Sequence, residues 1–171
     1  MQRRAFLVFT ASSASLALVS LSGCGFALRK APDFAFSTLF SGVPESSALG
    51  VELKRRLQAT GKVKVITDVR LLSQAQVVFE VQADQREKVV LSLTTAGQVR
   101  EFQLRLRFVF RLRTVGGKEL IAPTEITLQR DISFNESAVL AKETEEALLY
   151  RDMQSDVVQQ VMRRLAAVKE L

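Results

Sequence analysis

The sequence predicts an α+β fold, a two-layer sandwich in which two helices, one of them long and C-terminal, cover one face of a mostly antiparallel sheet of about four strands. Two patterns carry this prediction. From Phe102 to Leu112, large apolar residues alternate with charged or polar ones, which is the period of a strand with one buried face. From Leu149 to Val168, apolar residues recur at steps of four or three, which indicates a helix with one apolar stripe.

The first 23 residues resemble a bacterial export signal. Arg3 and Arg4 precede an apolar run of about 14 residues, which is shorter than the roughly 20 that cross a bilayer. The run ends in LSGC, which resembles a lipobox, the motif in which the cysteine is lipidated and the signal is cut before it. We therefore expect residues 1–23 to be cleaved and Cys24 to anchor the chain by its acyl groups. Both Sec and twin-arginine export fit this signal.

The remainder is predicted to consist of a lipidated tether, residues 24–33, and a single domain, residues 34–171. Gly25 stands where an aspartate would retain a lipoprotein in the inner membrane, so we expect the outer membrane. In the domain, the segment FAFSTLF over 34–40 predicts a strand. Helix-start residues from Pro44 onward and a closing Gly61 predict a helix of about 14 residues, and residues 62–67 predict a second strand.

Three longer strands joined by tight turns follow. The apolar alternation over 77–83 continues irregularly over 88–94, Ala96-Gly97 predicts a turn, and a strand spans 99–113. Gly116-Gly117 predicts the next hairpin, which leads to a strand over 120–134. Asn135 is a favourable N-cap for the last helix, predicted from Glu136 to about Lys169. We expect both helices to cover the apolar face of 102–112 and to leave the opposite, arginine-rich face available.

The composition argues against an enzyme. The chain has no histidine, and its one cysteine is the residue expected to carry lipid, so the usual nucleophile pairs and thiolate or imidazole metal sites lack their parts. Carboxylate-only chemistry stays possible, although Glu143, Glu145 and Glu146 lie on a predicted helix and are expected to form a solvated face. We expect no catalytic residue, no metal, no cofactor and no nucleic-acid partner.

The net charge is mildly basic. Without Arg3 and Arg4 the chain keeps 22 basic and 18 acidic residues, a balance of about +4. A charge of this size suits general solubility, and only a clustered subset of the cations would recruit a phosphate-bearing partner.

Taken in order, these elements resemble the LptE family of lipopolysaccharide-assembly lipoproteins. The matching pieces are the CGFALR start at Cys24, the strand REFQLRLRF from Arg100, Arg130 before the last helix, and AVLAKETE with Lys142. The resemblance implies an outer-membrane lipoprotein that plugs the large β-barrel LptD, supports its assembly, and binds lipopolysaccharide during delivery to the cell surface. It also implies a position facing the periplasm within that barrel.

The resemblance implies binding residues as well. Lys142 matches a lysine implicated in lipopolysaccharide binding in the family. The second family position, in the turn between the two long strands, is arginine in some members but Thr95 here, and we expect the flanking Lys88 and Arg100 to substitute. The arginines of the exposed sheet face are expected either to meet the polar lumen of the barrel or to be solvated: Arg105, Arg107, Arg111 and Arg113.

Two other roles stay open at this stage. One is an auxiliary lipoprotein of an ABC-type lipid transport system, which would use the same anchor at Cys24. The other is a periplasmic lipid carrier, which would need a sizeable apolar pocket inside the domain, whereas a plug would have a filled core.

Overall fold

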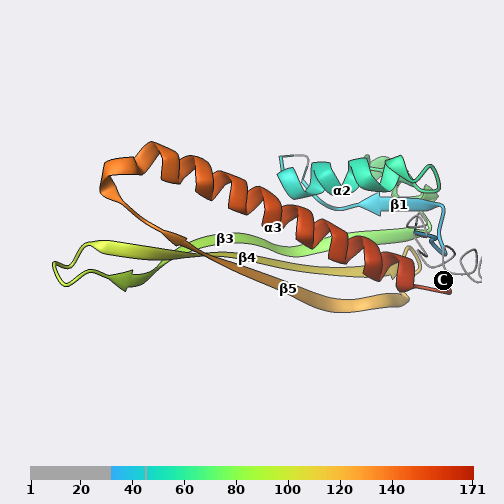
Figure 1. The fold of residues 1–171 in the computed structure, drawn as a ribbon. Coiled ribbons are helices and arrows are strands. Elements are labelled where there is room, and N and C mark those ends of the chain that lie inside the picture. Colours follow the sequence, from blue (N-terminus) through green and yellow to red (C-terminus); the bar gives the residue numbers. More distant parts are fainter. Residues whose placement is uncertain (1–31, 45) are drawn as a thin grey trace, which may run out of the picture. The chain divides into compact units, whose positions relative to one another are not determined.

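The computed structural model of the chain describes residues 32–44 and 46–171. The predicted signal peptide and Cys24 lie outside the described residues. The elements follow in this order: β1 (Thr38–Ser41), α2 (Ala48–Ala59), β2 (Lys64–Ile66), the 3₁₀ helix η2 (Val69–Gln74), β3 (Val77–Leu93), β4 (Val99–Thr114), β5 (Glu119–Ser133), the 3₁₀ helix η3 (Glu136–Ala138) and α3 (Val139–Ala167) (Figure 1).

The sheet has five strands in the order β2-β1-β3-β4-β5, where about four were expected. β1 pairs in parallel with β2 and with β3, and β3, β4 and β5 form an antiparallel meander. Both predicted hairpin turns are present. Gly97 at φ 82° and Gly117 at φ 94° adopt the left-handed backbone that glycine accepts without steric cost, which explains why glycine marks these turns.

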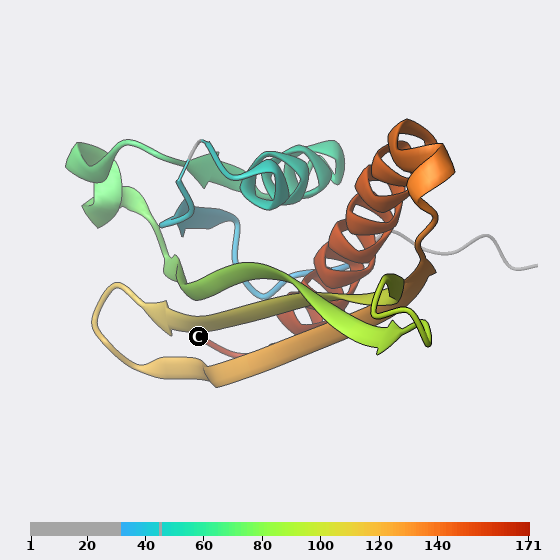
Figure 2. The same ribbon diagram turned by 90° about the vertical axis from the view of Figure 1, so that its left-hand side faces the viewer.

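Both helices lie on the same side of the sheet, which confirms the predicted fold class (Figures 1 and 2). α2 begins after Ser47, whose hydroxyl accepts a hydrogen bond from the Gly50 amide at 3.2 Å. Asn135 caps η3 by accepting from the Ser137 amide at 3.0 Å, so α3 itself begins at Val139, three residues later than predicted. The 29 residues of α3 give it a length of about 44 Å.

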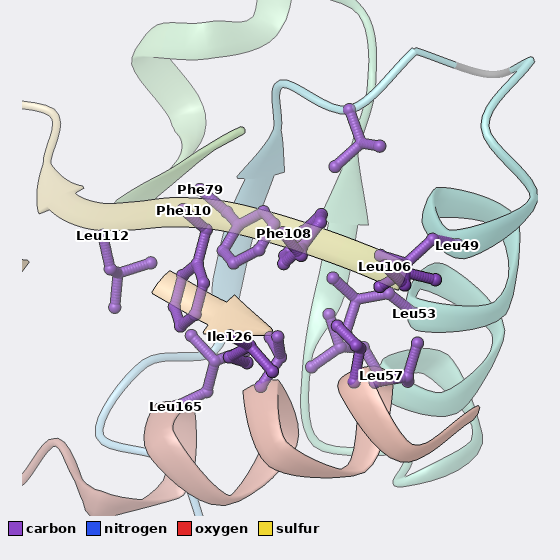
Figure 3. Packing of buried hydrophobic residues seen from close by; sticks show 14 of the residues in the cluster. Leu49, Leu53, Leu57, Phe79, Leu106, Phe108, Phe110, Leu112, Ile126 and Leu165 are labelled. Carbon is purple, nitrogen blue, oxygen red and sulfur yellow. The ribbon is translucent and has the colours of Figure 1, made fainter. Parts of the chain in front are cut away.

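The core lies between β4 and the two helices. Phe79, Phe108 and Phe110 are fully buried and their rings stack, with 5.3 and 5.9 Å between ring centroids. The predicted stripe of α3 packs onto them, and Figure 3 shows Leu165 of α3 beside Phe110 and Ile126. Three leucines of α2 close the same cluster: Leu49, Leu53 and Leu57. The alternation of β4 therefore separates a buried face from a polar one, as predicted.

The short helix η2 was not predicted. It follows β2 and packs on the side of the sheet opposite to α2 and α3, where Leu72 covers a small second cluster made of Phe40, Ile66, Ala75 and Val78. Its segment, VRLLSQ, is too short for a helical period to be recognised in the sequence. At this end of the sheet the second face is therefore partly covered.

A β-bulge at Gln82 changes which side chains of β3 face the helices. Val81 lies opposite Phe110 and Ala83 opposite Val109, so Gln82 is an extra residue in the ladder. Before the bulge, Val77, Phe79 and Val81 point into the core. Beyond it the parity is reversed, because a shift of one residue exchanges the two faces of a strand.

In the described part of the chain, no helix combines the length and the continuous apolar character that crossing a bilayer demands.

Candidate functional site

Beyond the bulge, the helix-facing side of β3 is polar. Asp84 accepts a hydrogen bond from Ser47 Oγ at 2.9 Å, and Arg86 Nη2 donates to Gln154 Oε1 of α3 at 2.9 Å. Lys88 comes next on this side, and its Nζ lies 2.6 Å from Glu146 Oε2 of α3. The outer half of β3 is therefore joined to the helices by polar contacts in place of the apolar core.

A hollow of about 230 Å³ lies at the end of the sheet where α3 begins. Its walls come from β3, β4, the end of β5 and the first two turns of α3. It is lined by Lys88, Phe102, Ile132, Ser133, Phe134, Val139, Lys142, Glu143 and Glu146. The structure thus brings together Lys88 and Lys142, two of the three predicted binding cations, although 54 positions separate them in the sequence.

Each of the two lysines is already engaged. The ammonium group of Lys88 lies 4.3 Å from the centre of the Phe102 ring, a cation–π contact, in addition to its ion pair with Glu146. The ammonium group of Lys142 donates to Ser133 Oγ at 3.0 Å and to Glu145 Oε2 at 2.8 Å. The hollow therefore presents two half-buried cations beside an aromatic pair, Phe102 and Phe134, whose rings meet edge to face.

Arg100, the third predicted cation, does not line this hollow. It borders a neighbouring hollow of about 430 Å³ together with Gln98, Asn135 and Glu136, and Phe134 is shared between the two. Its side chain is exposed, and its carbonyl accepts from the Phe134 amide at 2.8 Å.

Exposed apolar residues lie on the same elements as the residues that line these hollows. They stand on the β3 end of the hairpin and on the first turns of α3: Val89, Val90, Leu91, Leu93, Val139, Leu140 and Leu148. A surface that combines cations with exposed apolar side chains suits an amphiphilic anion. Sequence reasoning passed over these residues because the irregular alternation over 88–94 does not show which of them remain uncovered.

The three acids predicted to form a solvated helix face divide into two kinds. Glu143 and Glu145 are exposed, as expected. Glu146 departs from that expectation, because its side chain is only 23% exposed and pairs with Lys88. Within residues 32–44 and 46–171, no three His, Cys, Asp or Glu side chains come together as a group able to hold a metal ion.

The arginine row of β4 lies on the face away from the helices. Arg111 and Arg113 both bind Glu80 of β3, with Arg113 Nε at 2.8 Å from Glu80 Oε1. Partial burial raises the pKa of Glu80, but the hydrogen bonds and charges of the two arginines together outweigh this and hold the pKa below its ordinary value. The two guanidinium groups therefore share one carboxylate of the same sheet.

The other two arginines of the row also find partners on the sheet. Arg107 Nη2 donates to Glu125 Oε2 of β5 at 2.8 Å, and this hydrogen bond is the main reason that the pKa of Glu125 is lowered. Arg105 Nε donates to Gln103 Oε1 at 2.8 Å. Three guanidinium groups of the row therefore share two carboxylates of the sheet, Glu80 and Glu125, and the fourth is hydrogen-bonded to an amide oxygen.

Replacement of Glu80 by glutamine will destabilise the domain in a pH-dependent way. A carboxyl with a lowered folded-state pKa contributes stability above its ordinary pKa of 4.5 and loses it as the pH falls through the folded-state value. We expect Glu80→Gln to lower the free energy of unfolding by about 1 kcal/mol at neutral pH. Urea titrations should show this difference shrinking below pH 4.5. A difference that stays constant down to about pH 3 would show that the ion pairs contribute nothing.

Comparison with known proteins gives a consistent assignment. The model of the family described as LptE, lipopolysaccharide-assembly, matches residues 36–165. The solution NMR structure of lipoprotein B from Nitrosomonas europaea is 34% identical, covers 84% of this chain and 91% of its own, and has a TM-score of 0.71. The crystal structure of rare lipoprotein B from Shewanella oneidensis is 26% identical, covers 76% and 92%, and has a TM-score of 0.62.

A minor lipoprotein from Acinetobacter baumannii, 20% identical over 79% of this chain and 94% of its own, shares the fold with a TM-score of 0.61. Among curated proteins, none matches the chain.

Proposed function

This chain belongs to the LptE lipopolysaccharide-assembly family, and from that premise we propose that it is a non-catalytic outer-membrane lipoprotein that binds lipopolysaccharide and plugs an LptD-type barrel. The observation that carries the binding part of the proposal is the hollow in which Lys88 and Lys142 meet beside Phe102.

The chemistry of that hollow fits the ligand. Lipopolysaccharide presents phosphate groups next to acyl chains, so a binding surface needs cations next to apolar area. Lys88 and Lys142 are long cations whose stems leave the core undisturbed, and lysine binds phosphate as a compact charge. The exposed Leu91, Leu93 and Leu140 provide apolar area nearby.

The plug role is supported by the other face of the domain. A plug needs a filled core and a polar outer surface, because the lumen of a large barrel is polar. The core of this domain buries three phenylalanines completely, and the outer sheet face carries the paired arginines of β4. We propose that this face meets the barrel wall, with residues 24–33 as the tether to a lipidated Cys24.

The two alternative roles have less support. A lipid carrier encloses its ligand, and the hollows described above are open surface features bordered by charged side chains. An auxiliary lipoprotein of an ABC system would share the predicted anchor, so only its partner distinguishes it from a plug.

Purification from detergent-solubilised outer membranes tests the proposal. We expect the tagged chain to copurify with a large β-barrel protein, and mass spectrometry to find the mature N-terminus at an acylated Cys24. Recovery with an inner-membrane ABC complex would favour the auxiliary role. An N-terminus other than Cys24, or an unmodified one, would contradict the lipid anchor.

A further inference from the structure

We propose that Glu146 is a built-in competitor of the ligand: its carboxylate occupies the place of a ligand phosphate on Lys88 and must be displaced before lipopolysaccharide binds. The inference rests on the proposed function of the same hollow. The inference assigns to Glu146 an effect on the affinity of the site. This residue is an anion, whereas the residues expected to bind lipopolysaccharide are cations.

The geometry of Lys88 supports this competition. An ammonium group has three donors and no acceptor. The ring of Phe102 lies 4.3 Å away, and Glu146 Oε2 lies 2.6 Å away within the same hollow. The carboxylate therefore holds the closest anion position on Lys88, between the ring of Phe102 and α3, and a phosphate that binds at this position takes its place.

Glu145 forms a similar ion pair with Lys142, in which Glu145 Oε2 lies 2.8 Å from Lys142 Nζ, but we expect this pair to compete less with a ligand. The side chain of Glu145 is 49% exposed, against 23% for Glu146. Water screens an exposed ion pair more effectively than a half-buried one. We therefore expect Glu146 to be the principal competitor and Glu145 a minor one.

The Lys88–Glu146 ion pair is not needed to hold α3 against the sheet, because other contacts join the same two elements. One turn further along α3, the Tyr150 hydroxyl donates to the Glu87 carbonyl at 2.7 Å, and in the next turn Gln154 accepts from Arg86 at 2.9 Å. These contacts join the same two elements without Glu146. Loss of the ion pair should therefore change the thermal melt very little, while it frees the ammonium group of Lys88.

The chain offers a matched control. Glu143 lines the same hollow and carries the same charge, and in the described residues it makes no salt bridge. Glu143→Gln and Glu146→Gln therefore remove equal charge from the hollow, but only the second frees a lysine. A general electrostatic effect predicts similar gains in affinity for the two variants, whereas competition predicts a gain mainly for Glu146→Gln.

Calorimetric titration with detergent-dispersed lipopolysaccharide and, separately, with inorganic pyrophosphate tests the proposal at low ionic strength. An ion pair worth up to about 1 kcal/mol corresponds to roughly a fivefold change in affinity, so we expect Glu146→Gln to bind about fivefold more tightly than the wild type. In a Lys88→Gln background the same substitution should give no gain, because the two residues act as one unit.

Each outcome decides between the two proposals. Equal affinities in wild type and Glu146→Gln, or equal gains for Glu143→Gln and Glu146→Gln, would overturn the competition and leave lipopolysaccharide binding intact. Pyrophosphate binding that improves in Glu146→Gln, with no binding of lipopolysaccharide, would support the competition and contradict the proposed ligand. If Glu146→Gln binds neither probe, both proposals are wrong.

Discussion

Phe108→Asp will prevent the domain from folding or lower its free energy of unfolding by several kcal/mol. Phe108 is 0% exposed and stacks on Phe110 in the middle of β4. Removal of a buried phenylalanine ring alone costs about 3–5 kcal/mol, and the aspartate adds an unpaired charge in an apolar environment. Since a domain of this size is stable by only about 5–15 kcal/mol, the sum is comparable with its whole stability.

The adjacent residue provides the control. Arg107→Asp introduces the same side chain one position away, on the opposite face, where Arg107 is exposed and loses only its contacts with Glu125 and Gln85. We expect a cost of about 1 kcal/mol or less. Far-ultraviolet circular dichroism and urea titration measure both variants. Similar stability in the two would mean that the faces of β4 are wrongly assigned.

Replacement of both Lys88 and Lys142 by glutamate will reduce lipopolysaccharide binding well beyond tenfold. The two cations become anions in a hollow that already contains Glu143 and Glu146, so attraction of phosphate turns into repulsion. Binding of the wild type should also weaken with salt, because the screening length falls from about 10 Å at 0.1 M to about 3 Å at 1 M.

A second double variant separates the site from the overall charge. Lys54 and Lys64 lie on α2 and β2 and do not line the hollow, so Lys54→Glu with Lys64→Glu changes the net charge equally at a distance from the site. We expect this variant to retain most of the affinity, and Arg100→Glu to have an intermediate effect. Equal losses in both double variants would show that binding follows net charge, while an unchanged affinity in the Lys88 and Lys142 variant would place the contact elsewhere.

The fold was predictable to the extent that periodicity reveals burial. The alternation of β4 and the stripe of α3 each correspond to one buried face, and Gly97 and Gly117 mark turns that require a left-handed backbone. The bounds of the parallel strands at the edge of the sheet were harder to predict. β1 was predicted over 34–40 but spans Thr38–Ser41, because only these residues find partners in β2 and β3.

Lys88 and Lys142 of the candidate hollow could be named from the sequence, but the geometry that brings them together could not. By the alternation of Val77, Phe79 and Val81, Lys88 would point away from the helices, and only the bulge at Gln82 turns it toward Phe102 and Glu146. A bulge leaves no period in the sequence, since Gln82 is an ordinary polar residue in a polar stretch. For the same reason the pairing of Glu80 with the arginine row depends on strand register, which a single sequence does not contain.

The bulge at Gln82 divides β3 into a first half that contributes to the core and a second half that lies mostly on the surface. Substitutions at Val77 or Phe79 act on the amount of folded protein, since both side chains are fully buried. Substitutions at Lys88 or Leu91 act on surface that the core does not use. Substitutions in the second half of the strand should therefore cost less stability than substitutions in the first half, whose side chains form the core. One inserted residue thus places a core segment and a surface segment in a single continuous strand.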